Sequence, residues 1–330
     1  MIRSKIVRRL GLLVMSATLA LVVAEIALRI VDPFHTGEVL AREAFEHAIL
    51  ESHWEFAGPV LRPNVSAEFL GHEHRTNSAR MRNPEIPVEK PSGVFRVAVA
   101  GDSIAFGWGV EESDCFPRVL ERMLNDGPKP PGIARFEVIN GGTPGWGIPG
   151  YAYWLKNTGL AYDPDAVVVT FINNDLTELI KTVEGDAAAP DVLVLPGWCK
   201  WSYVARAWQN VDALWFGARG DLALALKSNP QVTDPACDLA CQGLEVTRQF
   251  CGERPFVVVD TLGDEHGSWL PRFVQDLADR RIARIDAFLP LADYQNRFAV
   301  SAIDVHPNAA GHRLYAEWIH AWLRAHAIPR

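Results

Sequence analysis

The stretch Val97-Ala98-Val99-Ala100-Gly101-Asp102-Ser103 decides the fold that we expect for this chain. Its four consecutive apolar residues are typical of a strand covered on both faces, as the strands of parallel sheets are. Gly101 permits a tight turn directly after such a strand. We therefore expect Ser103 at the carboxyl end of a buried strand, where open α/β sheets bind their ligands.

Similar apolar runs follow along the chain, with helical patterns between them. The runs predict strands at Phe95–Ala100, Phe136–Ile139, Ala166–Phe171 and Phe256–Val259, and a weaker one near Ile282–Ile285. Helices are expected at Phe116–Leu124, with Pro117 in the first turn, and at Leu314–Leu323. This alternation predicts a doubly wound α/β fold, a three-layer flavodoxin-like sandwich around a central parallel sheet of about five strands.

The N-terminus has the pattern of a signal anchor or signal peptide. Arg3, Lys5, Arg8 and Arg9 precede an apolar run that continues past Glu25 to Leu28. That run is just long enough to span a bilayer, although Val22-Val23-Ala24 resembles a cleavage site. We favour an uncleaved anchor. Because positive residues stay cytoplasmic, the rest of the chain is expected outside the cytoplasm, in the periplasm, with a cleaved secreted form as the alternative.

The remaining sequence divides by composition. Residues 1–32 form the signal segment, 33–93 a proline-punctuated linker and accessory segment, and 94–330 the main domain. An insert at about 176–237 contains a helical stretch around Ser202–Leu214 and four tryptophans. We expect these tryptophans either to wall a pocket or to form a small satellite core; they are Trp198, Trp201, Trp208 and Trp215.

Charge and cysteine content exclude some functions. A net charge of -8 over 330 residues argues against nucleic acid as a partner. Among the five cysteines, Cys237, Cys241 and Cys251 lie close enough in sequence to contribute one disulfide, leaving Cys115 or Cys199 as a free thiol. No second Cys or His pair follows Cys237-x-x-x-Cys241 at ligand spacing, so we expect neither a metal nor a cofactor.

A serine and a histidine far apart in sequence suggest nucleophilic catalysis. A serine nucleophile needs a base, and the base needs a partner that holds its orientation. Ser103 supplies the first group, His306 the second and Asp304 the third. The backbone amides of Ser103 and Gly142 and the side chain of Asn174 are expected at the same sheet edge, where they would stabilise an oxyanion.

With these residues the chain resembles the SGNH/GDSL-type serine hydrolases. That family has a Ser in Gly-Asp-Ser, then a Gly, an Asn, and an Asp-His pair near the C-terminus. Ser103, Gly142, Asn174 and His306 match these blocks in order, with Asp304 as the acid. The resemblance runs from about residue 95 to the end and implies ester hydrolysis through an acyl-enzyme.

Two positions depart from the family pattern, and a segment upstream of Ser103 resembles one subgroup of the family. Asn173 stands where the family often has Gly, and Ile303 stands where it often has the acid. Upstream, Arg62-Pro63-Asn64 and Asn77-Ser78 resemble a membrane-anchored bacterial subgroup. The resemblance implies a carboxylic ester substrate, a small molecule, lipid or glycan, including O-acetyl or acyl groups of the cell envelope. The alternatives are an O-acyltransferase acting on surface glycans with the same residues and a catalytically silent carbohydrate-binding module.

Several other residues are interpreted as structural. Asp102 and Asp175 are expected to bond local amides at turns. Gly145–Gly150 fits the dinucleotide fingerprint G-x-G-x-x-G, but it follows the second strand rather than the first, and Pro149 removes an amide donor. His72 and His74 are expected to form a surface pair on a strand rather than a metal site.

Overall fold

The computed structural model describes residues 2–53, 56–172, 175, 179, 195–216, 230–261, 270–289 and 294–329. The chain divides into two compact units. The smaller unit comprises residues 1–44 and 189–222, and the larger one comprises residues 45–188 and 223–330.

A five-stranded parallel sheet forms the centre of the larger unit. Its strand order is β6-β5-β7-β8-β9, which in chain order is 2-1-3-4-5, the order of flavodoxin-like folds. The expected α/β fold and number of strands are therefore confirmed. The strands are β5 (Val94–Gly101), β6 (Arg135–Gly142), β7 (Ala166–Phe171), β8 (Phe256–Asp260) and β9 (Ala283–Asp286).

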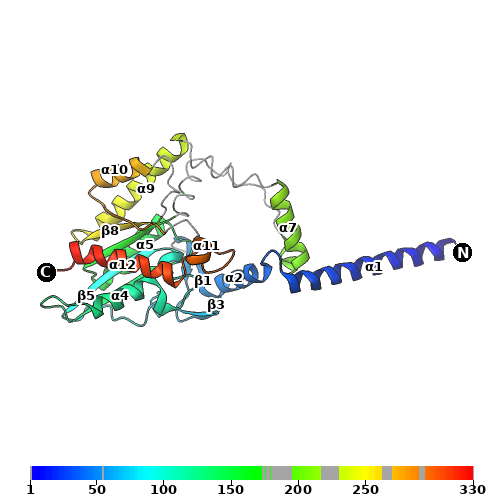
Figure 1. Cartoon of the computed structure of the whole chain (residues 1–330), viewed down its shortest axis with the longest axis horizontal. Coiled ribbons are helices and arrows are strands. Elements are labelled where there is room, and N and C mark those ends of the chain that lie inside the picture. Colours follow the sequence, from blue (N-terminus) through cyan, green and yellow to red (C-terminus); the bar gives the residue numbers. More distant parts are fainter. Residues whose placement is uncertain are drawn as a thin grey trace. The chain divides into compact units, whose positions relative to one another are not determined.

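Side chains of the central strands alternate between two apolar cores, one on each face of the sheet. Val97 and Val99 of β5 enter one core, and Ala98 and Ala100 enter the other. The first core is covered by α4 (Phe116–Asp126) and α12 (Ala309–His326), and the second by α5 (Ile148–Asn157), α9 (Pro230–Cys251) and α10 (Leu270–Asp279) (Figure 1). The expected helices near 116–124 and 314–323 are thus confirmed, and Pro117 lies in the first turn of α4.

Residues 45–93 are packed into the same unit as the sheet. The C-terminal end of α2 (Thr36–Ile49) is followed by two antiparallel hairpins, β1–β2 and β3–β4. Phe45, Ile49, Leu61 and Phe69 form a third apolar core with Phe106 and Trp108, which follow β5. The hairpin strands are β1 (Leu50–His53), β2 (Phe56–Leu61), β3 (Ser66–Phe69) and β4 (His72–Arg75).

The expectation of a surface histidine pair on β4 was wrong. His72 is partly exposed, but His74 is fully buried and lies against the rings of Phe45 and Phe106. The two side chains share a strand face, as predicted, yet the third core covers one of them. Sequence alternation alone did not show that residues 45–69 would supply this cover.

The smaller unit contains a long apolar helix. Helix α1 (Ile2–Val31) includes a stretch of 27 residues, Lys5–Val31, that is long and apolar enough to cross a membrane. The carboxylate of Glu25 accepts hydrogen bonds from the amides of Tyr203 and Val204, and so caps helix α7 (Tyr203–Phe216). The helix expected around Ser202–Leu214 is confirmed. The short remaining elements are α3 (Ser103–Phe106), α11 (Tyr294–Arg297) and the 3-10 turns Glu112–Asp114, Gly159–Tyr162 and Gly197–Cys199.

Of the four tryptophans of the insert, the three whose side chains the structure describes do not form a satellite core. Trp198, Trp201 and Trp208 are 79%, 60% and 68% exposed. The side chain of Trp215 and most of residues 176–194 and 217–229 lie outside the described residues. The described part of the insert therefore presents its aromatic rings at a surface.

Candidate active site

Ser103 lies where the sequence predicts it, at the carboxyl end of β5. It is the first residue of α3, and Asp102 caps this short helix by accepting a hydrogen bond from the Ile104 amide at 3.0 Å. The other oxygen of Asp102 lies 2.8 Å from Ser103 Oγ. Asp102 therefore has the local bonding role that we expected, and it also fixes the serine hydroxyl. Burial raises the pKa of this carboxyl, against the bonds from Ser103 and Ile104 that lower it.

His306 connects Ser103 to Asp304. His306 Nε2 lies 2.8 Å from Ser103 Oγ, and His306 Nδ1 lies 2.5 Å from Asp304 Oδ1. The backbone amide of His306 also donates to Asp304 Oδ1, which closes a tight turn over the Asp-x-His motif. The structure thus brings together three residues that the sequence separates by about two hundred positions. The serine hydroxyl has one proton and two neighbouring acceptors, Asp102 and His306, so it donates to one of them at a time.

Trp108 is the residue at this site that sequence reasoning missed. Its indole Nε1 donates to Asp304 Oδ2 at 2.8 Å, and its ring lies 5.4 Å from that of His306. Gly107 and Gly109 on either side have positive φ angles of 87° and 70°, which place the tryptophan on a sharply turning loop. In the sequence, Gly107-Trp108-Gly109 indicates a turn, but it does not indicate that Trp108 bonds to Asp304, which is far away along the chain.

The environment of Asp304 keeps it ionised. Burial alone would raise the pKa of this carboxyl, but hydrogen bonds from His306 and Trp108, together with the charge of His306, lower the pKa to about 2. Because both oxygens have donors, the carboxylate has a fixed orientation toward the imidazole. An ionised, fixed carboxylate is suited to stabilise an imidazolium.

Arg82 fixes the loop that follows Ser103. Its guanidinium is fully buried and donates to the carbonyl oxygens of Phe106, Gly107 and Val110. Phe106 and Gly107 are the last residue and the C-terminal cap of α3, where carbonyl acceptors lack partners within the helix, and Val110 lies in the loop that follows. Residues 45–93, for which the sequence predicts only a linker and accessory segment, therefore contribute directly to the position of Ser103 and Trp108.

Gly142 lies at the end of β6, as predicted, but its amide already has an acceptor. The Gly142 N–H donates to Asn140 Oδ1 at 2.9 Å. A Cβ atom at this position would lie 2.2 Å from Phe106 N, so glycine is required for α3 to pack on β6. Close packing against α3 is therefore the reason for a glycine at position 142, and its amide is not free to bind an oxyanion.

Asn174, the other residue expected to bind the oxyanion, and its neighbour Asn173 lie outside the described residues. Asp175 is described and buried, and it accepts hydrogen bonds from the Ile172 amide at 2.9 Å and the Tyr151 hydroxyl at 3.2 Å. This is the structural role expected for Asp175. Gly145–Gly150, the discounted dinucleotide motif, forms the turn into α5 and the start of that helix.

The cysteines form no disulfide in this structure, since all five are free thiols. Cys115, Cys237, Cys241 and Cys251 are buried, and Cys199 is partly exposed. The pairing considered for Cys237, Cys241 and Cys251 is therefore not observed.

Comparison with known proteins assigns the family. A sequence model of the GDSL-like lipase/acylhydrolase family matches residues 99–314, a range that includes Ser103 and His306 and covers more than half of the chain. The fold and this match define an ester-bond hydrolase. The chain belongs to the GDSL-like lipase/acylhydrolase family. No curated protein matches the chain.

Several solved structures are similar at low sequence identity. A lipase/acylhydrolase from Enterococcus faecalis is 16% identical, with 72% of this chain and 98% of that chain covered and a TM-score of 0.42. A lipase from a goat rumen metagenome is 15% identical, with 71% and 98% covered and a TM-score of 0.43. An acetyl xylan esterase is also 15% identical, with 69% and 100% covered and a TM-score of 0.41.

Proposed function

We propose that this protein is a serine esterase that works through an acyl-enzyme. Ser103 Oγ attacks the ester carbonyl carbon while His306 Nε2 accepts the hydroxyl proton and then gives it to the leaving alcohol. Water, deprotonated by His306, attacks the acyl-enzyme; the bond from Ser103 Oγ to the acyl carbon breaks, and His306 returns the proton to Oγ as the acid is released. The observation that carries this proposal is the continuous series of hydrogen bonds from Asp304 through His306 to Ser103.

The oxyanion that forms in both steps needs donors that are already in place. We assign this role to the Ser103 amide and the Asn174 side chain, with a third donor from the turn that follows β6. Because the Gly142 amide is bonded to Asn140, we favour Gly145 for that third donor in place of Gly142. Gly145 is exposed, has a φ of +79°, and its amide has no acceptor among the residues that the structure describes.

The substrate proposed is a carboxylic ester of the cell envelope, an O-acetyl group on a glycan or an acyl group on a lipid. A surface-directed enzyme would meet such esters, because they are carried by the glycans and lipids of the cell envelope. Transfer of the acyl group to a glycan hydroxyl needs the same residues, so the acyl acceptor distinguishes an esterase from a transferase.

The experiment that tests the function measures both the acyl-enzyme and its fate. The full-length chain in detergent is mixed with p-nitrophenyl acetate, and the products are followed with and without an added glycan. We expect acetate release that is abolished in Ser103→Ala and retained in Ser113→Ala, a control on an exposed serine. Release of nitrophenol with the acetyl group recovered on the glycan instead of as acetate would identify a transferase. An inactive, well-folded wild type would support the silent binding module and contradict the proposal.

For the location, we propose that α1 is an uncleaved anchor and that the sheet-containing unit lies outside the cytoplasm. The apolar side chains of α1 are exposed in the chain itself, including Leu13, Leu19 and Leu21, and they require a nonpolar environment. At 1.5 Å per residue, the 27-residue stretch extends about 40 Å, more than the hydrocarbon thickness of about 30 Å.

The exposed tryptophans next to α1 support this assignment. The guanidinium of Arg29, near the end of α1, donates to the Trp201 carbonyl and lies 4.7 Å from the ring of Tyr203. Tryptophan and tyrosine concentrate at membrane–water interfaces, so Trp198, Trp201 and Trp208 are proposed to contact the headgroup region.

Two measurements test the location and the uncleaved anchor. Alkaline phosphatase fused to the C-terminus should be active, because this enzyme folds only outside the cytoplasm. The intact mass of the purified chain should show that its N-terminal residues are still present. An inactive fusion, or loss of residues 1–24, would contradict this location or the uncleaved anchor, respectively.

A further inference from the structure

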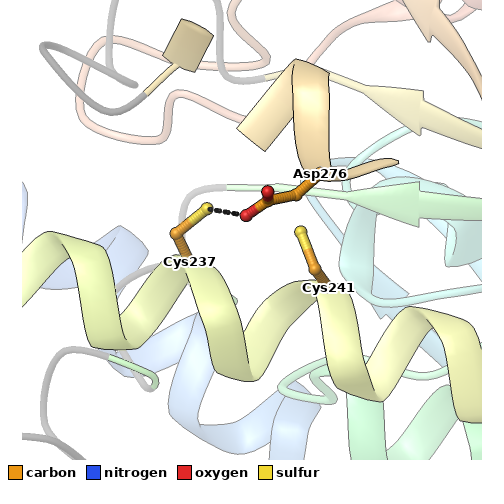
Figure 2. Close-up of side chains that lie close together, drawn as sticks. All are labelled: Cys237, Cys241 and Asp276. Carbon is orange, nitrogen blue, oxygen red and sulfur yellow. Dashed lines mark hydrogen bonds between the residues drawn. The ribbon is translucent and has the colours of Figure 1, made fainter. Parts of the chain in front are cut away.

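Two thiols and a carboxylate meet between α9 and α10, outside the site described above. Cys237 and Cys241 lie one turn apart on α9, and Asp276 of α10 points between them (Figure 2). The two sulfur atoms and a carboxylate oxygen all lie within 4.8 Å of one another. The distance from Cys237 Sγ to Asp276 Oδ2 is 3.9 Å.

We propose that these three side chains bind a thiophilic divalent cation such as Zn²⁺. Thiolate and carboxylate are regular zinc ligands, with metal–sulfur bonds of about 2.3 Å and metal–oxygen bonds of about 2.0 Å. In a tetrahedral site such bonds place a sulfur and an oxygen about 3.5 Å apart. The observed 3.9 Å between Cys237 and Asp276 is close to that separation, and Cys241 Sγ lies within 4.8 Å of both atoms, so the three ligands can bind one ion by drawing closer together.

Nothing in the sequence indicates a third ligand near the two cysteines. The spacing Cys237-x-x-x-Cys241 is not followed by another Cys or His pair, which was the ground for expecting no metal. On a helix, however, residues four apart lie on the same face, and the third ligand comes from a different helix. Asp276 is 35 positions beyond Cys241 in the printed sequence, and only the packing of α10 on α9 brings it to the thiols.

A cationic side chain, Arg272, lies beside the carboxylate of the cluster. Arg272 lies 3.6 Å from Asp276 Oδ2 and forms ion pairs with Asp234 at 2.9 Å and Asp238 at 2.5 Å. At metal sites, polar side chains that contact a ligating carboxylate help to orient it. Two thiolates and Asp276 carry three negative charges, of which a divalent cation neutralises two, and Arg272, which Asp276 shares with Asp234 and Asp238, partly offsets the remaining one.

The location indicates a structural role for the cation. Both cysteines are fully buried in the apolar core shared by α5, α9 and α10, whereas the Asp276 side chain is 28% exposed and gives access from solvent. A bound cation would join α9 to α10. Binding replaces two thiol protons, which are released to solvent, so no oxidant or reductant takes part.

The test uses Cd²⁺ as a spectroscopic probe of the reduced, full-length chain in detergent. We expect one Cd²⁺ per chain, an ultraviolet charge-transfer band from thiolate to metal, and a higher unfolding temperature when Cd²⁺ or Zn²⁺ is added. Cys237→Ser and Cys241→Ser should lose the band. Cys251→Ser is the matched control, since Cys251 is also a buried cysteine of α9 but lies outside the cluster.

The Asp276→Asn variant distinguishes loss of a metal ligand from loss of the fold, because the change is isosteric and the side chain is partly exposed. We expect this variant to fold like the wild type and to bind Cd²⁺ at least tenfold more weakly. Three results would overturn the proposal: no band in reduced, folded wild type; an equal band in Cys237→Ser; or oxidation of the two thiols to a disulfide in preference to binding when Zn²⁺ is in excess.

Discussion

The indole nitrogen of Trp108 donates a hydrogen bond to Asp304 Oδ2 at 2.8 Å, while the imidazole of His306 is bonded to the other oxygen of the same carboxylate. Trp108 is held in turn by the rings of Phe45 and Phe69, at 5.2 Å and 5.0 Å between ring centroids. The apolar core built by residues 45–69 therefore reaches the acid of the proposed site through a single side chain.

Replacing Trp108 with Phe tests this relationship. The ring remains, but Asp304 loses a donor to a charged acceptor, an interaction of about 1.5–3 kcal/mol. We expect kcat for an aryl ester to fall by about 10- to 100-fold, with little change in KM, because the loss affects the orientation of His306 and not substrate binding. An unchanged kcat would show that His306 alone orients the carboxylate. Trp318→Phe, on α12, is the control.

The ionisation of Asp304 predicts a pH-dependent contribution to stability. Its pKa is about 2 in the folded protein, below the ordinary value of 3.8. The unfolded chain therefore takes up this proton first, and the stabilisation is present above about pH 3.8 and is lost as the pH falls through 2. In Asp304→Asn, the decline of unfolding free energy between about pH 4 and 2 should be shallower than in wild type. Equal slopes, with Asp279→Asn as the control, would contradict the assigned pKa.

The buried His74 predicts a loss of stability at a higher pH. Burial, with the charge of Arg82, lowers the pKa of His74 from 6.5 to about 3. Between these values the unfolded chain binds a proton that the folded protein does not, so stability falls as pH decreases below 6.5. Each such group contributes about 1.4 kcal/mol per pH unit.

In His74→Phe, the unfolding free energy should fall less steeply with decreasing pH, because one group that takes up a proton on unfolding is gone. Denaturant unfolding at several pH values from 7 to 4 measures this slope. His312 is also buried and has a pKa lowered to about 3, so the variant should retain part of the slope. If wild type and His74→Phe lose stability in parallel, His74 is already protonated in the folded state or is not buried.

The proposed oxyanion donor Asn174 is tested by truncation. Asn174→Ala should cost about 2–4 kcal/mol of transition-state stabilisation, or roughly 30- to 1000-fold in kcat, the range for one lost donor. KM should change less, because the oxyanion exists only in the transition state and intermediate. Turnover equal to that of wild type would remove Asn174 from the proposed site.

The sheet was predictable because its strands are nearly uniform in chemistry. Strand β7 is apolar at five of six positions and is buried along its whole length, so its bounds, Ala166–Phe171, were predicted without error. Ser103 and His306 were identifiable because short motifs mark them, and the carboxyl ends of parallel strands meet at one edge.

Contacts from residues 45–93 could not be predicted in the same way. Arg82 and His74 are polar residues in a polar, proline-containing segment, and nothing local shows that both are fully buried. Their burial depends on the loop after Ser103, which supplies acceptor carbonyls for Arg82 and an aromatic ring beside His74. The same reason applies to Gly142, whose glycine requirement comes from α3 packing against it.

In the proposed mechanism, His306, oriented by Asp304, activates Ser103 as a nucleophile. Labelling of the full-length chain in detergent with a fluorophosphonate probe tests it most directly, because the probe requires an activated serine and no knowledge of the substrate. We predict stoichiometric labelling of wild type and of a His326→Ala control, and none of Ser103→Ala or His306→Ala. Undiminished labelling of either of the last two variants, or no labelling of folded wild type, would contradict the claim.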